Sequence, residues 1–170
     1  MKAKLLALFV ALLMVGCGES STPSDPVDPL DSLKATDFDD PETVDKILAE
    51  ATLILEYREK NGETLGYGVG EQTPYSGWEK TMHSNGEVKA LLQYKDGKPD
   101  GLSFYWHRNG QKEKELKYKD GKLMSAVSWK DNGEECLETK VEDGNGFVGW
   151  TRARGGKFSV TYKDGERVEE

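Results

Sequence analysis

The two histidines of this chain are its first candidates for chemistry, because they occupy equivalent positions in a repeating pattern. His83 and His107 each lie two residues before an Asn-Gly pair. On equivalent strands of adjacent hairpins they would be two strand spacings apart, about 9.5 Å. That is too wide for two imidazoles on one ion, since a Zn–N bond is about 2.1 Å long, and Lys130 at the next equivalent position supplies no third ligand. We therefore expect exposed histidines beside turns, and no metal site.

The other nucleophiles and acids show no arrangement typical of an enzyme. Cys136 would need a nearby base to act as a catalytic thiol, and we expect it to be a small strand side chain. The acids alternate with lysines, as in residues 112–115, whereas catalytic carboxylate pairs need a cleft that separates their pKa values. The sequence has no Ser-His-Asp order, phosphate-binding glycine loop or zinc-ligand spacing. It therefore predicts a noncatalytic protein without a cofactor.

Aromatic side chains on the expected strands are the remaining candidates for binding. One interpretation is that most of them pack a thin sheet. The other starts from the single layer, which leaves one face partly exposed, and exposed aromatic surface above a few hundred Å² usually marks an interaction site. Tyr105 is expected to point outward, because it alternates with Phe104 and Trp106. The candidate binding surface consists of Trp78, Tyr105, Trp106 and Trp129.

Turn dipeptides recur at a nearly fixed period and define the elements that carry these residues. Asn-Gly pairs recur at residues 61, 85, 109 and 132. Asp-Gly pairs recur at residues 96, 120, 143 and 164. Two interleaved ladders with a period of about 24 residues are the signature of a repeat array.

These dipeptides predict an all-β fold, an antiparallel meander of tandem β-hairpins after one short N-terminal helix. A two-residue hairpin turn needs φ > 0 at both central residues, which Asn-Gly and Asp-Gly tolerate best. The segments between turns alternate as strands do, with Leu102, Phe104 and Trp106 on one face. The repeat domain should span 53–170, in which Gly155-Gly156 replaces the last Asn-Gly pair. Its approximate units are 53–76, 77–100, 101–124, 125–147 and 148–168.

Residues 41–52 are expected to form the helix. Asp40 can cap it, and Pro41 suits its first position, where the missing N–H costs nothing. Apolar residues spaced i, i+3, i+4 and i+7 place one stripe on a single side. The helix should therefore pack on the first strands and cap one end of the array. The stripe consists of Val44, Ile47, Leu48 and Ala51.

The first 40 residues predict an export signal and a spacer. The apolar run Leu5–Val15 is too short to span a bilayer, which needs about 20 residues. Its end, Leu13-Met14-Val15-Gly16-Cys17, is similar to the bacterial lipobox. This resemblance implies a signal peptide over 1–16, cleavage between Gly16 and Cys17, and lipid attachment at Cys17; a plain secreted protein is the alternative. Residues 17–40 are rich in Ser, Pro and Asp and predict a disordered tether.

The net charge of the chain indicates which classes of partner it can bind. Loss of residues 1–16 leaves 21 basic and 31 acidic residues, a formal net charge of −10. Phosphate backbones would repel such a chain, so no nucleic acid partner is expected. Membrane contact is expected through the lipid, since each buried CH₂ contributes roughly 0.8 kcal/mol. With Cys17 acylated, Cys136 has no cysteine left for an intrachain disulfide.

Two segments carry a resemblance to a known family. They read Trp106-His107-Arg108-Asn109-Gly110-Gln111-Lys112 and Tyr118-Lys119-Asp120-Gly121-Lys122. This pattern resembles the variant MORN repeat of bacterial YwqK-type proteins, as does the leading segment Thr73–Trp78, and the likeness spans roughly 53–165. The resemblance implies a hairpin-repeat sheet and an antitoxin label, although an antitoxin that meets its toxin in the cytoplasm would not carry an export signal.

The functional expectation is a noncatalytic interaction module in the cell envelope. It would be exported, lipid-anchored to a bacterial membrane, and would bind another envelope protein or a glycan through one face of the sheet. The alternative is an antitoxin-like inhibitor of a toxin protein that acts in the envelope.

Overall fold

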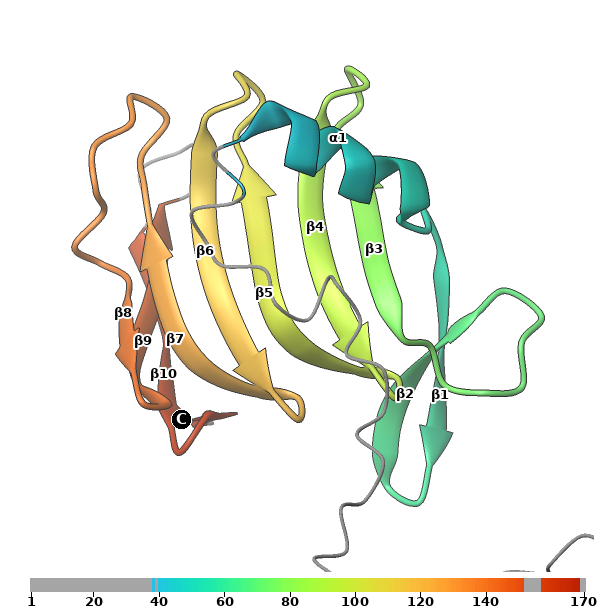
Figure 1. Cartoon of the computed structure of the whole chain (residues 1–170). Helices are drawn as coiled ribbons and strands as arrows, with labels where there is room; N and C mark the ends of the chain where they lie inside the picture. Colours follow the sequence, from blue (N-terminus) through green and yellow to red (C-terminus); the bar gives the residue numbers. More distant parts are fainter. Residues whose placement is uncertain (1–37, 39, 152–156, 169–170) are drawn as a thin grey trace, which may run out of the picture. The chain divides into compact units, whose positions relative to one another are not determined.

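The computed structural model describes residues 38, 40–151 and 157–168, which belong to one compact unit. This part of the chain is an antiparallel β structure with one short helix (Figure 1). The predicted signal peptide, the lipid-bearing Cys17 and the Gly155-Gly156 turn lie outside the described residues. No described helix is long and apolar enough to cross a membrane.

Helix α1 spans Pro41–Glu50 and begins where the sequence predicts. Asp40 Oδ2 accepts hydrogen bonds from Thr43 Oγ1 at 2.7 Å and from Thr43 N at 3.0 Å, and these hold the pKa of this carboxyl below its usual value. The helix ends two residues earlier than predicted, because Ala51 has an extended backbone, although its N–H still donates to Ile47 O. Ile47 is fully buried, so the apolar side of the helix faces the protein.

The strands follow one another as hairpins, which confirms the antiparallel meander. The main sheet has the order β11-β10-β9-β8-β7-β6-β5-β4-β3, so neighbours in the chain are neighbours in the sheet. The strands are β1 Leu55–Lys60, β2 Glu63–Gly68, β3 Gly77–Met82, β4 Val88–Lys95, β5 Lys98–Trp106, β6 Lys112–Lys119, β7 Lys122–Ser128, β8 Lys140–Glu142, β9 Asn145–Thr151, β10 Lys157–Lys163 and β11 Glu166–Arg167.

The first predicted unit, 53–76, is not part of this meander. Strands β1 and β2 pair only with each other and form a separate two-stranded sheet. Their hairpin contacts the main sheet at single hydrogen bonds rather than by strand pairing. Gly66 N donates to Gly97 O at 2.8 Å, and the hydroxyls of Tyr57 and Tyr94 are 2.9 Å apart. The edge of β3 is instead covered by Thr52, which forms a parallel bridge there.

The Asp-Gly turns have the predicted geometry. Asp96 and Gly97 have φ of +50° and +80°, as a two-residue type I′ turn requires, and the Asp-Gly pairs at 120, 143 and 164 have nearly the same values. Each turn also contacts its neighbours along the row. Gly121 N donates to Pro99 O, and Gly165 N donates to Gly144 O. The row of turns is therefore tied together by backbone hydrogen bonds.

The Asn-Gly pairs at 85, 109 and 132 differ from the prediction, because only their glycines have positive φ. Gly86 N donates to His83 O and His83 N donates to Glu87 O, which makes a three-residue loop. Asn85 Oδ1 accepts from Glu87 N at 3.2 Å, so the asparagine acts through its side chain rather than through a left-handed backbone. The loops at 109–110 and 132–133 repeat this arrangement.

One face of the main sheet, which we call the helix face, is covered near β3–β5 by α1 (Figure 1). Phe38, three residues before the start of this helix, covers the same face over β5. Phe38 is buried and stacks on Phe104, with ring centroids 4.0 Å apart, and its ring also lies 5.5 Å from that of Trp78. Phe38 falls within the segment predicted as a disordered tether, so the tether prediction is wrong at this residue. Burial of the aromatic ring explains why it belongs to the folded part.

The opposite face, which we call the tyrosine face, carries a second core. Leu116, Leu123, Ala126 and Val141 form its buried cluster, and Tyr162 of β10 packs against them. In a flat sheet β6 and β10 would be about 19 Å apart, at four strand spacings. The sheet therefore curls, which brings β9 and β10 behind β7 in the view of Figure 1.

Candidate binding groove

A groove opens beside the upper part of β7, because the next strand is too short to continue the sheet. Strand β8 has three residues, whereas β7 and β9 each have seven, and β8 meets β7 only at Ala126 and Val141. Beyond this point the chain forms a loop over 129–139. Thr139 Oγ1 holds the loop to β9, since it accepts from Gly149 N at 3.0 Å and donates to Gly149 O at 3.1 Å.

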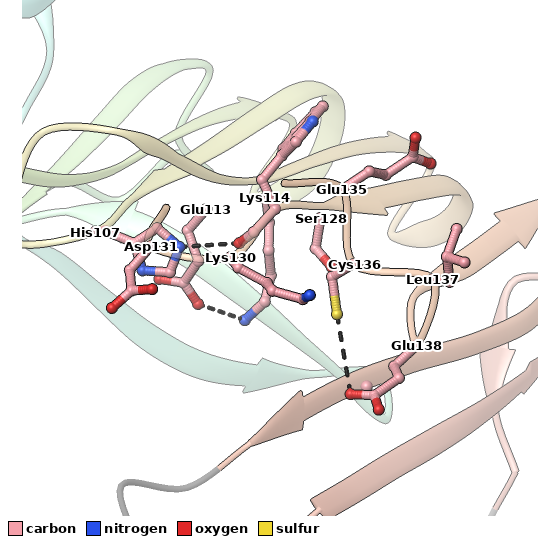
Figure 2. A pocket seen from close by; sticks show the side chains of 12 residues that line it. His107, Glu113, Lys114, Ser128, Lys130, Asp131, Glu135, Cys136, Leu137 and Glu138 are labelled. Atoms are coloured by element: carbon pink, nitrogen blue, oxygen red, sulfur yellow. Dashed lines mark hydrogen bonds and ion pairs between the residues drawn. The ribbon is translucent and has the colours of Figure 1, made fainter. Parts of the chain in front are cut away.

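The groove has a volume of about 740 Å³, within the range of small-molecule sites. Figure 2 shows His107, Glu113, Lys130 and Asp131 on one side of the groove and Cys136, Leu137 and Glu138 on the other. The side chains of the lining include cations, carboxylates, a hydroxyl and a thiol. The residues are His107, Glu113, Lys114, Ser128, Trp129, Lys130, Asp131, Glu135, Cys136, Leu137, Glu138 and Gly149.

Both lysines of the groove are held in ion pairs. Lys114 Nζ is 2.9 Å from Glu113 Oε1 and also lies 5.8 Å from the ring centre of Tyr105. Lys130 Nζ is 3.0 Å from Glu134 Oε2, and this hydrogen bond raises the pKa of Lys130 and lowers that of Glu134. The positive charges of the groove are thus partly neutralised before any ligand arrives.

Ser128 has a buried hydroxyl in the wall of the groove. The residue is 4% exposed, and Oγ has no hydrogen-bond partner among the residues that the structure describes. A buried hydroxyl without a partner costs about 1–3 kcal/mol. The backbone beside it is satisfied, since Cys136 N donates to Ser128 O at 2.8 Å. The unmet hydrogen-bonding capacity therefore belongs to the side chain alone.

The prediction that both histidines are exposed is wrong. Each imidazole is half-buried and hydrogen-bonded to a backbone carbonyl. His107 Nε2 lies 2.9 Å from the carbonyl oxygen of Trp129, and His83 Nε2 lies 2.8 Å from that of Trp106. A carbonyl can only accept, so Nε2 carries the proton in both rings. Each half-buried imidazole thus links one hairpin to the next. In the described part of the chain, no group of three His, Cys, Asp or Glu residues is placed to hold a metal ion.

Cys136 lies in the loop and is half-buried. Its Sγ is 4.0 Å from Glu138 Oε2, the contact that Figure 2 shows beside the groove. The imidazole of His107 lines the same groove, but its Nε2–H is used on the carbonyl of Trp129. The prediction of Cys136 as a strand side chain is wrong, because residues 134–139 form a loop.

The four residues predicted as one binding surface lie in different environments. Trp78 is 3% exposed beneath Phe38, so it cannot reach a partner, and we remove it from that surface. Tyr105 does point to the face opposite Phe104, yet there it packs against the second core, where burial raises its pKa. Of the four, Trp129 lines the groove.

Trp106 and Trp129 are both half-buried and lie near Lys112 and Phe104. Lys112 Nζ is 5.4 Å from the ring centre of Phe104 and 5.6 Å from that of Trp129. These cation–π contacts hold the indole of Trp129 on the Phe104 side of the sheet, opposite to Ser128 and Lys114.

Sequence analysis does not identify Ser128, Lys114 or Glu135 as groove residues. The available signal is the segment Glu134–Thr139, which lacks the alternation of a strand although it falls where the third hairpin should return. Loss of alternation between two turn dipeptides indicates a loop, and a loop that interrupts a sheet leaves a gap beside it.

The chain was compared with known proteins in three ways. No family model, no curated protein and no solved structure matches it.

Proposed function

We propose that this protein is a noncatalytic, lipid-anchored module of the bacterial envelope that binds an envelope protein or a glycan through the groove. Export and acylation rest on the lipobox-like segment that ends at Cys17. The hairpins of about 24 residues, with their Asp-Gly turns tied in a row, support a MORN-like repeat architecture. The observation that carries the binding role is the groove itself, a 740 Å³ hollow with a buried, unpartnered hydroxyl in its wall.

The groups of the groove favour binding over catalysis. A nucleophilic cysteine is activated by a base within hydrogen-bond reach. The contact made by Cys136 is with the Glu138 carboxylate at 4.0 Å, and the His107 Nε2–H is committed to a carbonyl. The lysines are paired with carboxylates. Such groups can recognise a ligand, but they have no arrangement that moves a proton or attacks a bond.

Affinity capture tests the proposal. The full chain, tagged at its C-terminus, is extracted in mild detergent from cells that make it, after brief cross-linking. Capture is compared for the native chain, Lys114→Ala and Lys112→Ala. The second substitution is the matched control, because Lys112 also lies on β6 and forms an ion pair, but it lies outside the groove lining.

The proposal expects one envelope component whose recovery falls with Lys114→Ala and persists with Lys112→Ala. Equal recovery with both variants, or no component above the untagged background, would contradict it. Recovery of a toxin protein instead would favour the antitoxin-like alternative.

A further inference from the structure

The helix face carries a second apolar area, which continues from Phe104 toward β7. The rings of Phe104 and Trp106 have their centroids 6.0 Å apart, and the strand register places Val127 on the same face. Figure 1 shows α1 along β3–β5, whereas β7 lies beyond the end of this helix. We call this area the indole strip, and its half-buried members are Leu102, Trp106, Val127 and Trp129.

Two lysines give the indole strip a positive charge. Lys112 Nζ is 5.6 Å from the ring centre of Trp129 and 3.6 Å from Glu115 Oε2, so part of its charge is balanced on the same face. Lys117 is paired in register with Leu102, which places it on this face too, and it is exposed. With two lysines against one carboxylate, the strip favours an apolar segment that also carries acidic side chains.

Phe38 fixes the point from which the preceding chain can reach this strip. Its ring stacks on Phe104, at the β5 side of the strip. An extended chain covers at most about 3.6 Å per residue, so Leu33, five residues earlier, can lie up to about 18 Å from Phe38. Strand β7 is two strand spacings from β5, about 10 Å. The segment that precedes Phe38 is therefore long enough to lie across the strip.

This segment has the composition that the indole strip favours. Residues 25–33 read Asp-Pro-Val-Asp-Pro-Leu-Asp-Ser-Leu. Its three apolar side chains recur every third residue, which is the period of a polyproline II helix, and its three aspartates recur at the same period. The two prolines favour this conformation for themselves and for the residues before them. Aromatic surfaces bind polyproline II segments well, because such segments lose little entropy on binding.

We propose that residues 25–33 of this chain bind to the indole strip as a polyproline II helix. Leu30 and Leu33 then contact the indoles of Trp106 and Trp129, while the aspartates lie beside the two lysines. The two leucines are about 9 Å apart in such a helix, close to the separation of β5 and β7. The groove stays open, because Lys114 lies on the opposite face.

Binding shortens the reach of the folded part from the membrane. Phe38 lies 21 residues after Cys17, and a free tether of this length extends to at most about 75 Å. With residues 25–33 bound, the chain between Cys17 and Asp25 extends to at most about 30 Å. This consequence, unlike the binding itself, rests on the proposed acylation of Cys17.

Tryptic cleavage after Lys34 tests the inference. Lys34 is the only lysine or arginine among residues 18–40, and it directly follows Leu33. The full chain in mild detergent is treated with dilute trypsin, and the product is quantified by mass spectrometry. The reference is a synthetic peptide of residues 18–40. We expect the chain to be cut at least about tenfold more slowly than the peptide, because trypsin cuts the released segment.

Variants show whether this protection comes from the indole strip. Leu30→Ser and Trp129→Ala should each speed cleavage at least about fivefold, since each removes an apolar contact from one side of the interface. Leu137→Ser is the matched control, because Leu137 is exposed and lies on the loop beside the groove, and its rate should stay within about twofold of the native rate. Leu30 precedes the described part of the chain, so its substitution reports on binding even if Trp129→Ala destabilises the fold.

Cleavage of the native chain within about twofold of the peptide rate overturns the inference. Protection that neither Leu30→Ser nor Trp129→Ala reduces also overturns it, because Phe38 alone would then shield Lys34. Protection that depends on Leu30 but not on Trp129 would place the segment elsewhere and reject the indole strip. None of these results affects the proposed function, whose test depends on Lys114 in the groove.

Discussion

Replacement of Gly144 by alanine tests whether close backbone packing holds the row of Asp-Gly turns together. Gly144 has a φ of +78°, and its carbonyl oxygen accepts from Gly165 N at 2.9 Å. A Cβ at position 144 would lie 2.6 Å from Gly165 N, a distance that requires the backbone to shift. Gly121 is the matched control, because it has a φ of +81° in the same kind of turn and the nearest heavy atom would be 3.9 Å away.

The two substitutions share one cost and differ in another. Each places an L residue in the left-handed region, which costs about 1–2 kcal/mol. Gly144→Ala adds overpacking against the backbone of the next turn, typically about 1–3 kcal/mol. We therefore expect the free energy of unfolding to fall by about 1–2 kcal/mol for Gly121→Ala and by about 2–5 kcal/mol for Gly144→Ala.

Urea unfolding followed by tryptophan fluorescence measures this difference. With an m value of about 1–3 kcal/mol per molar urea, the midpoint of Gly144→Ala should lie about 1 M below that of Gly121→Ala. Equal midpoints would refute the reasoning, since they would mean that the turns do not press on each other.

Three further predictions follow from the fold and the N-terminal segment. Phe38→Ala should lower the free energy of unfolding by about 3–5 kcal/mol in urea titrations, because it opens a cavity over Phe104. Leu137 is exposed, so Leu137→Ala should lower this free energy by less than about 0.5 kcal/mol. Equal losses for the two variants would argue against the packing of Phe38. Burial raises the pKa of Tyr94 and Tyr118 in the folded state, so these phenols stay protonated while the same groups in the unfolded chain ionise near pH 10.0. The free energy of unfolding should therefore be constant below this pH and should fall as the pH rises above it. A melting temperature that stays constant from about pH 8 to about pH 11 would contradict this. Cys17→Ser should abolish incorporation of labelled palmitate and release the protein from the membrane fraction, whereas unchanged labelling would rule out acylation at Cys17.

Local sequence signals account for the hairpins and for the start of the helix. Asp-Gly pairs tolerate two consecutive positive φ values, so the periodic pairs at 96, 120, 143 and 164 predict their turns, whereas Asp100-Gly101, which falls outside that period, lies within β5. Asp40 and Pro41 mark the first turn of α1 for similarly local reasons. The Asn-Gly pairs are ambiguous, because asparagine can also accept a hydrogen bond from the backbone in a three-residue loop, as Asn85 does.

Features that depend on distant contacts could not be predicted. The separation of β1–β2 from the main sheet depends on contacts such as Gly66 with Gly97, which no local pattern encodes. The burial of Trp78 depends on Phe38, a single aromatic residue in a polar segment. The groove requires both the short β8 and the curl that brings β9 toward β7, so its lining comes from residues far apart in the chain.

The central claim is that the groove is the binding site, and affinity capture with two variants of β6 tests it most directly. The account predicts that recovery of the envelope component falls with Lys114→Ala, which changes the groove, and persists with Lys112→Ala, which does not. Equal recovery with both variants would contradict it.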